Sequence, residues 1–362
     1  MKYPASDVRA SHIYIALSIS TIVAFTACAQ APADDAKGVG ATTAGHLFTR
    51  SYVTMGSPLS VSIWTTDDRT AEQASDALFK EFERLDNALS VWKPDSDVVK
   101  INAAAGNRAV PVGPDAIQAI EAARQISDLT DGKFDVTFGA LADVWKFDQD
   151  KDNRVPTDVE IKARLPLINY RDVVVDEEKR TVALARKGMR LHLGGIGKGY
   201  AVDHGATILR AAGLSNFMIQ FGGDLYVAGY RDGKPWRLGI RDPRGSPDSI
   251  FAELDLSDAT FSTSGDYERF FIKDGKRYSH IIDPDTGQPA RGCRSVTIVS
   301  NSATLADGLS TGVYLLGPEK GMALIERLSD VEGVIVSASN EVMVSSGLKG
   351  KVLMVGKPTD GA

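Results

Sequence analysis

Hydrophobic positions recur along the first part of the chain with two different spacings. Apolar and polar residues alternate from Leu59 to Ile63, which is typical of a strand with one buried face. From Thr70 to Leu89 the apolar residues recur at spacings of four, three and four, which predicts an amphipathic helix. A second helix is expected after Pro114, because proline suits a first helical turn, and the Asp131-Gly132 pair should end it.

The second half of the chain has a less regular order of elements. Strands are expected at Thr181–Leu184, Leu191–Leu193, Phe217–Phe221, Arg237–Ile240, Phe251–Leu256, Ser295–Val299, Val334–Ser337, Val342–Ser345 and Val352–Val355. Helices are expected at Tyr200–Ala212, Ala303–Leu316 and Glu319–Leu328. Because helices and strands do not alternate strictly, the pattern favours an α+β fold with mixed or antiparallel sheets and flanking helices over a doubly wound sheet.

The first 27 residues have the organisation of a secretory signal peptide. Lys2 and Arg9 precede an apolar run, Ile13–Phe25, that is too short to remain as a membrane-spanning helix. The sequence Phe25-Thr26-Ala27-Cys28 resembles a bacterial lipobox, in which the cysteine receives a lipid and becomes the mature N-terminus. Cleavage after an Ala-x-Ala-like stretch, with Cys28 lost or unmodified, is the alternative.

The residues after Cys28 have little to bury. Their Ala, Gly, Asp and Thr content predicts a flexible tether, so we expect residues 28–46 to be the lipidated cysteine and tether and residues 47–358 to be one folded domain. The expected location is the periplasmic side of a bacterial membrane, with the lipid as the sole membrane contact.

Composition and charge narrow the function classes. The chain has 362 residues, of which 43% are hydrophobic and 24% charged, as in ordinary globular proteins. Its net charge of −6 provides no basic field for nucleic acid. Two cysteines, Cys28 and Cys293, are too few for a disulfide framework.

A glycine-rich segment from Leu191 to Gly199 stands between an expected strand and an expected helix. Its backbone N–H groups could approach a phosphate, and Lys198 would add a positive charge. The spacing fits neither a P-loop nor a dinucleotide-binding fingerprint, so a tight turn without a ligand is an equal alternative. Gly222-Gly223-Asp224 allows the same two interpretations.

Asp307 and Thr311 lie four residues apart on an expected helix and therefore on one face. A carboxylate and a hydroxyl suit Mg²⁺, which takes few protein ligands and completes its shell with water and phosphate. Such pairs are also common by chance.

His280 is the histidine best placed for proton transfer. It ends an expected strand beside the carboxylates of Asp283 and Asp285, where a neutral imidazole could accept a hydroxyl proton, although a structural role is the commoner one. The chain has no histidine pair with metal-binding spacing and no G-x-S-x-G elbow around Ser264, which argues against a zinc hydrolase and a serine hydrolase.

Taken in order, these segments resemble the FAD:protein FMN transferase family, also called the ApbE family. The resemblance runs from about Tyr52 to Val355. It rests on the segments above and on Met55-Gly56, Leu89-Ser90-Val91-Trp92-Lys93-Pro94-Asp95-Ser96, Gly132-Lys133-Phe134-Asp135, Thr263-Ser264-Gly265-Asp266-Tyr267-Glu268-Arg269 and Ser279-His280-Ile281-Ile282-Asp283-Pro284.

The resemblance implies a fold of two lobes with FAD in a cleft between them and Mg²⁺ across the diphosphate. It also implies transfer of FMN to a Thr or Ser hydroxyl of an acceptor protein, with release of AMP. The expected acceptors are subunits of membrane electron-transfer complexes.

Carried over residue by residue, the resemblance also implies site roles. FAD binding falls to Met55, Trp92, Lys133, Phe134, Asp135, His192, Lys198 and Ile281. Magnesium binding falls to the carbonyl of Gly195 and to Asp307 and Thr311, and His280 would be the base toward the acceptor hydroxyl.

Two positions depart from the family pattern. His192 stands where Asp is usual, and Trp92 stands where Tyr is usual. They leave two other functions open, an FAD diphosphatase that uses water as acceptor and a non-enzymatic flavin-binding lipoprotein. The resemblance implies that, in family members that hydrolyse FAD, polar side chains in this region serve a second metal. An indole cannot bind a metal, so transfer to protein is the favoured hypothesis.

Overall fold

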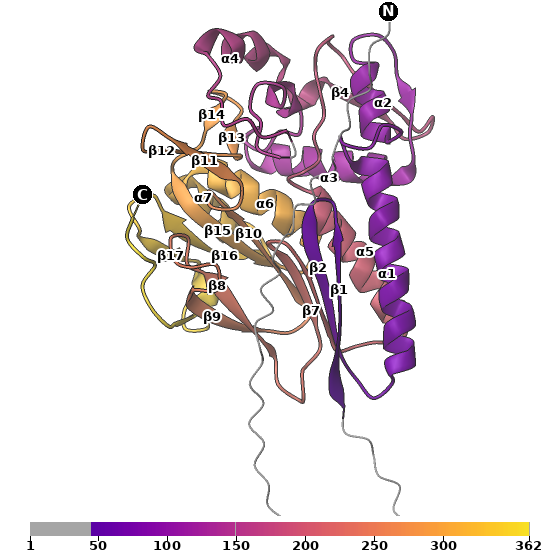
Figure 1. Cartoon of the computed structure of the whole chain (residues 1–362), viewed down its shortest axis with the longest axis vertical. Coiled ribbons are helices and arrows are strands. Elements are labelled where there is room, and N and C mark those ends of the chain that lie inside the picture. The colour runs from indigo at the N-terminus through magenta and orange to yellow at the C-terminus, as the bar shows by residue number, and fades with distance from the viewer. Residues whose placement is uncertain (1–44, 149, 362) are drawn as a thin grey trace, which may run out of the picture. The chain divides into compact units, whose positions relative to one another are not determined.

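The computed structural model describes residues 45–148 and 150–361 (Figure 1). The predicted signal peptide, Cys28 and nearly all of the predicted tether lie outside these residues. Strand β1 begins at His46, the last residue of that tether. No helix within the described ranges combines the length and the apolar character that crossing a membrane requires.

An eight-stranded sheet forms the centre of the fold, with every neighbouring pair antiparallel. In spatial order its strands are β1 (His46–Thr54), β2 (Ser57–Thr65), β6 (Phe217–Phe221), β7 (Asp224–Ala228), β10 (Ala259–Gly265), β15 (Cys293–Ser300), β16 (Glu332–Ser337) and β17 (Val342–Val344). Alternate residues of one strand enter different cores: Phe217 and Ile219 belong to one cluster, while Met218 packs against another.

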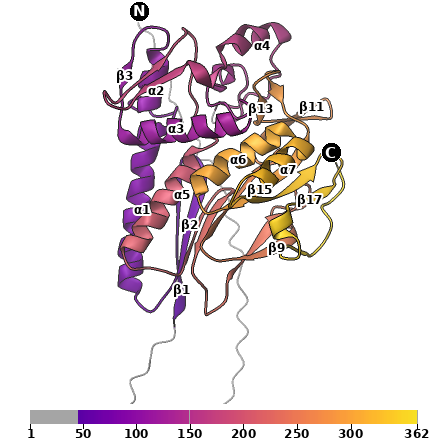
Figure 2. The ribbon, with the colours of Figure 1, turned by 180° about the vertical axis from the view of Figure 1, so that it is seen from behind.

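Four helices cover one face of this sheet (Figures 1 and 2). They are α1 (Asp68–Leu89), α5 (Gly197–Ala211), α6 (Ala303–Leu316) and α7 (Pro318–Arg327). The stripe predicted for α1 is buried, and the side chain of Asp67 caps this helix by accepting from the N–H of Thr70 at 3.1 Å. These helices and the sheet enclose the larger hydrophobic core.

A three-stranded sheet packs on the opposite face. Its order is β18 (Leu353–Met354), β9 (Ile250–Leu256) and β8 (Trp236–Arg241). Trp236, Leu238 and Phe251 meet Phe261 and Val334 of the large sheet in a second core. The result is a helix–sheet–sheet arrangement with two cores.

The remaining elements form a second lobe that includes α3 (Figures 1 and 2). They are α2 (Asp97–Ala103), β3 (Val110–Pro111), α3 (Pro114–Leu129), η1 (Gly139–Leu141), α4 (Asp158–Arg164), η2 (Leu165–Leu167), η3 (Tyr170–Asp172), β4 (Val173–Asp176), β5 (Thr181–Leu184), β11 (Phe270–Lys273), β12 (Lys276–Ser279), β13 (Ile282–Asp283) and β14 (Gln288–Pro289). A short turn, η4 (Ser346–Leu348), belongs to the sheet lobe. The α+β class and the two-lobe arrangement predicted from the sequence are confirmed.

One predicted strand is wrong. Leu191–Leu193 forms no strand, because its backbone groups have other partners. The side chain of Asn102 accepts from the N–H of Leu191 at 2.6 Å and donates to its carbonyl at 3.0 Å, and the N–H of His192 donates to the carbonyl of Val136 at 2.8 Å. These bonds hold the glycine-rich segment as a loop that leads into α5.

Candidate functional site

A cleft of about 1090 Å³ lies between the two lobes. Eleven residues predicted for the site line it: Trp92, Lys133, Phe134, Asp135, His192, Gly195, Lys198, His280, Ile281, Asp307 and Thr311. Met55 instead packs against the main core in the β1–β2 turn, where its φ is 45°, and the next residue, Gly56, lines the cleft. The structure therefore brings together residues from widely separated parts of the sequence.

Lys198, in the first turn of α5, lies between two buried carboxylates. Its ammonium contacts Asp224, and its Nζ is 3.8 Å from Oδ1 of Asp307. Burial alone would lower the pKa of Lys198, but the charges of Asp224 and Asp307 outweigh it, so the pKa lies above its usual value. Burial, together with the Asp224 charge, raises the pKa of Asp307 well above its usual range. The cleft thus has a charged floor with one more carboxylate than ammonium.

Asp307 belongs to a set of oxygen donors that fits a small hard cation. Asp307 is 4% exposed, and Thr311 follows it by one turn of α6. A Cβ placed on Gly195 would lie 3.7 Å from Oγ1 of Thr311, so the Gly195 backbone faces the same helix turn. One carboxylate, one hydroxyl and one carbonyl suit Mg²⁺, which leaves its other positions to water and phosphate oxygens. No group of three or more His, Cys, Asp and Glu side chains in the described residues could hold a metal, so this smaller set is the candidate.

Helices α5 and α6 approach each other closely where these donors lie. The N–H of Gly199 donates to Oδ2 of Asp307 at 2.8 Å. Asp203, one turn further along α5, accepts from the N–H groups of Ala303 and Thr304 at 2.8 and 2.9 Å and so caps α6. Two contacts between the helices therefore fix Lys198 relative to Asp307.

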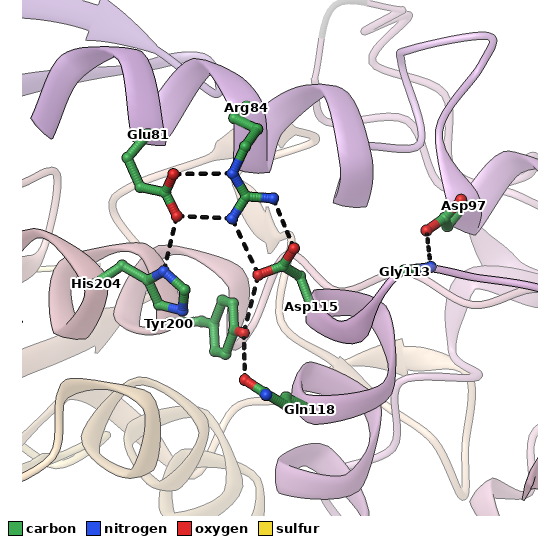
Figure 3. A network of polar contacts seen from close by, with 8 residues as sticks. All are labelled: Glu81, Arg84, Asp97, Gly113, Asp115, Gln118, Tyr200 and His204. Carbon is green, nitrogen blue, oxygen red and sulfur yellow. Dashed lines mark hydrogen bonds and ion pairs between the residues drawn. The ribbon is translucent and has the colours of Figure 1, made fainter. Parts of the chain in front are cut away.

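A polar network on the far side of α5 holds it against α1 and α3 (Figure 3). Arg84 of α1 binds Glu81 and also Asp115 of α3, both at 2.7 Å. Tyr200 of α5 donates to Oδ1 of Asp115 at 3.2 Å, and the ring of His204 lies 2.8 Å from Glu81. Three helices are thus tied together directly behind the turn that carries Lys198.

His280 follows β12 and lines the cleft. Its backbone N–H donates to the carbonyl of Arg269 at 3.0 Å, and its Nδ1 lies 3.2 Å from the same oxygen. Because a carbonyl can only accept, Nδ1 carries the proton and Nε2 holds the lone pair. Burial, with the charge of Arg269, lowers the pKa of His280 to about 4. At neutral pH the ring is therefore an uncharged base with Nε2 available.

Lys133, Phe134 and Asp135 form the opposite wall. Nζ of Lys133 contacts Asp283 and Asp285, each at 2.8 Å, which joins this loop to the β13–β14 hairpin. The carboxylate of Asp135 accepts from the N–H groups of Thr137 and Tyr170 at 2.7 and 2.8 Å. Asp135 therefore shapes the loop through both of its oxygens.

The two positions that depart from the family pattern have distinct surroundings. Trp92 is 44% exposed and lines the cleft. Nδ1 of His192 accepts from the N–H of Gly194 at 3.1 Å, and burial lowers the pKa of His192. A neutral ring with Nδ1 as acceptor presents an Nε2–H donor, where Asp would present an acceptor.

The structure adds three residues that the site prediction omitted. Asp224 is 1% exposed and contacts Lys198 and Ser262. The hydroxyl of Ser264 lies 3.0 Å from that of Thr311, and Arg269 is paired with Asp148 at the cleft wall. Gly222-Gly223 before Asp224 was the available signal, since two glycines ahead of a carboxylate indicate a close backbone approach.

Comparisons with known proteins agree on one family. A family model described as the ApbE family matches residues 55–335. An FAD:protein FMN transferase of Klebsiella pneumoniae (strain 342) is 32% identical over 302 residues, which cover 83% of this chain and 92% of that protein. The ApbE protein of Thermotoga maritima superposes with a TM-score of 0.79 at 32% identity, covering 84% of this chain and 99% of the other. The flavin transferase ApbE from Vibrio cholerae superposes with a TM-score of 0.77 at 29% identity, covering 85% of this chain and 99% of the other.

Proposed function

We propose, since the chain belongs to the ApbE family, that it is an FAD:protein FMN transferase: it moves FMN from FAD to a Thr or Ser hydroxyl of an acceptor protein and releases AMP. The observation that carries this proposal is the grouping of Lys198, Asp307, Thr311 and His280 in one cleft. A cleft of about 1090 Å³ has room for a dinucleotide.

The reaction replaces the phosphoanhydride bond of FAD by a phosphate ester of the acceptor. The acceptor oxygen forms a bond to the FMN-side phosphorus, the P–O bond to the AMP side breaks, and AMP leaves with the electron pair. Nε2 of His280 would accept the hydroxyl proton during the attack. Lys198 would bind the diphosphate and balance the charge that grows on the leaving phosphate.

Asp307, Thr311 and Gly195 would hold Mg²⁺, which supplies further charge neutralisation at the diphosphate when bound. Trp92 and Phe134 would cover the flavin, and the His192 Nε2–H would donate to the nucleotide. The acceptors would be subunits of membrane electron-transfer complexes, reached from a lipid anchor on Cys28 at the periplasmic side.

A mass measurement tests the proposal. Purified protein, FAD, Mg²⁺ and a subunit that carries the family's target motif should yield acceptor heavier by one phosphoflavin group, and a chelator should stop the reaction. Free FMN and AMP with unmodified acceptor would instead support the FAD diphosphatase. Binding of FAD with no product of either kind would support a flavin carrier.

Replacing His280 by Asn tests the assigned base. Asn keeps a donor toward the carbonyl of Arg269 but has no Nε2, so kcat should fall about 100-fold, as is usual for loss of a general base, while FAD affinity is kept. His46→Asn, on β1, is the matched control.

The pH profile gives a second measurement on the same group. Because the folded pKa of about 4 lies below the usual 6.5, His280 stays neutral from about pH 5 upward. Wild-type kcat should therefore show no loss from His280 protonation between pH 5.5 and 7.5. A titration near pH 6.5 that His280→Asn removes would contradict this assignment.

A further inference from the structure

A second hollow, the side groove, opens next to the cleft beyond Arg269. It has a volume of about 590 Å³ and is lined by Phe147, Lys151, Asn153, Glu268, Arg269, Phe270, Phe271 and Ile272. Phe147, Glu268 and Arg269 line both the side groove and the cleft. The two hollows therefore adjoin at Arg269, the residue whose carbonyl holds His280.

One wall of the side groove is β11, an edge strand of a two-stranded sheet. The β11–β12 turn has two residues, Asp274 and Gly275, with φ of 51° and 70°. In such a hairpin the two residues that flank the turn exchange backbone hydrogen bonds. Further from the turn, pairs that do not exchange hydrogen bonds alternate with pairs that do. From the observed register, Phe270 and Ile272 of β11, which both line the groove, direct their N–H and C=O groups away from β12.

Two contacts support this orientation. The N–H of His280 donates to the carbonyl of Arg269. The alternation predicts a hydrogen-bonded pair at this position. The carbonyl of Phe270 accepts from Nζ of Lys151 at 2.8 Å from the outer side. Within the described residues nothing binds the outward backbone groups of Ile272, which is 62% exposed. The strand thus offers free backbone groups next to the catalytic cleft.

The acceptor of an FMN transferase is a protein, and its hydroxyl must reach a phosphorus between two lobes. A folded surface is too broad to enter, whereas an extended segment is narrow and leaves its backbone free to pair with an edge strand. The path from Ile272 to Arg269 is three residues, about 10 Å at strand spacing. A short extended segment would therefore span it.

We infer that an extended segment of the acceptor protein pairs with β11 in the side groove and thereby leads its Thr or Ser hydroxyl past Arg269 to His280. The inference rests on the proposed function and adds to it the place and the manner of acceptor binding. An acceptor N–H would replace Lys151 at the carbonyl of Phe270, and the Ile272 N–H would donate to an acceptor carbonyl.

Ile272→Pro tests the pairing directly. Proline removes the outward N–H of Ile272 without removing a β11–β12 hydrogen bond, because that N–H faces away from β12. With a purified flavin-accepting subunit of a membrane electron-transfer complex as probe, KM for the acceptor should rise at least about 10-fold, the usual scale for loss of one backbone bond and the strand alignment it supports. FAD affinity should not change.

The matched control is Ser51→Pro. Ser51 is exposed on β1, an edge strand of the large sheet, and its register also directs its N–H away from the neighbouring strand. This variant should keep the wild-type KM for the acceptor. An unchanged KM in Ile272→Pro, in an assay where the wild type modifies the acceptor, would overturn the inference and leave the proposed function intact. A wild type that modifies no acceptor would instead count against the function itself.

Hydrogen exchange gives a readout that does not depend on how well the proline variant folds. The amide of Ile272 in the wild-type enzyme should exchange more slowly when FAD and an acceptor with its target Thr changed to Ala are both present. Unaltered exchange would contradict pairing at β11. Slow exchange that instead follows enzyme concentration without acceptor would assign the edge to a second copy of this chain and would equally overturn the inference.

Discussion

Asp307→Asn should reduce FMN transfer about 1000-fold or more, the scale expected when a charged group that stabilises the transition state is lost. Asn has the shape of Asp and can still accept from the N–H of Gly199. What disappears is the negative charge that, with Thr311 and the carbonyl of Gly195, suits a divalent cation. The measurement is acceptor mass against time at increasing Mg²⁺.

The same variant should fold as well as the wild type. Burial and Asp224 raise the pKa of Asp307, so the ionised form is less stable in the native state than in the unfolded chain at neutral pH. Removing that charge should leave the melting temperature unchanged or higher. Asp258→Asn, at an exposed turn, is the control for charge removal. Activity retained by Asp307→Asn at ordinary Mg²⁺ would exclude the assigned cation role.

Gly199→Ala should destabilise the protein by about 3 kcal/mol or more, at the upper end of overpacking costs. A Cβ on Gly199 would lie 2.2 Å from the carbonyl oxygen of Ala303 and 2.7 Å from Cβ of Asp307. Both neighbours belong to α6 and neither can move without shifting that helix. Thermal unfolding should show the loss, and residual activity should be lower than stability alone explains, because Lys198 and Asp307 move apart.

Gly197→Ala is the matched control in the same helical turn. A Cβ there meets nothing within 4 Å, and Ala is a better helix former than Gly by up to about 1 kcal/mol. The melting temperature should stay the same or rise. If both alanine variants have the same stability, the close α5–α6 contact does not limit which side chain residue 199 can carry.

The sequence predicted long amphipathic elements well and polar elements poorly. Helix α6 has the predicted bounds, and β6 matches the predicted strand, because their apolar residues recur with a clear period. Strand β10 was missed since its buried positions include Thr and Ser, whose hydroxyls bond to neighbours such as the carbonyl of Leu225. Helix α2, started by the Ser96 cap, was too short for a periodic signal.

The sequence predicted many residues that line the cleft, but not the contacts between them. Most residues carried over from the family resemblance line one cleft. They could be identified from the sequence because each belongs to a short local motif. Asp224 could not be ranked above an ordinary turn residue without the Lys198 contact, which joins β7 to α5. The side groove could not be predicted, because it combines the β11–β12 hairpin with Lys151, which lies in a separate part of the chain.

Lys198 has a consequence for how this protein matures. Its ammonium gives Asp224 and Asp307 a cationic neighbour, which offsets part of the cost of burying the two carboxylates. The polypeptide can therefore reach its native form before any nucleotide binds. The protein should accordingly be stably folded before FAD, its substrate, binds.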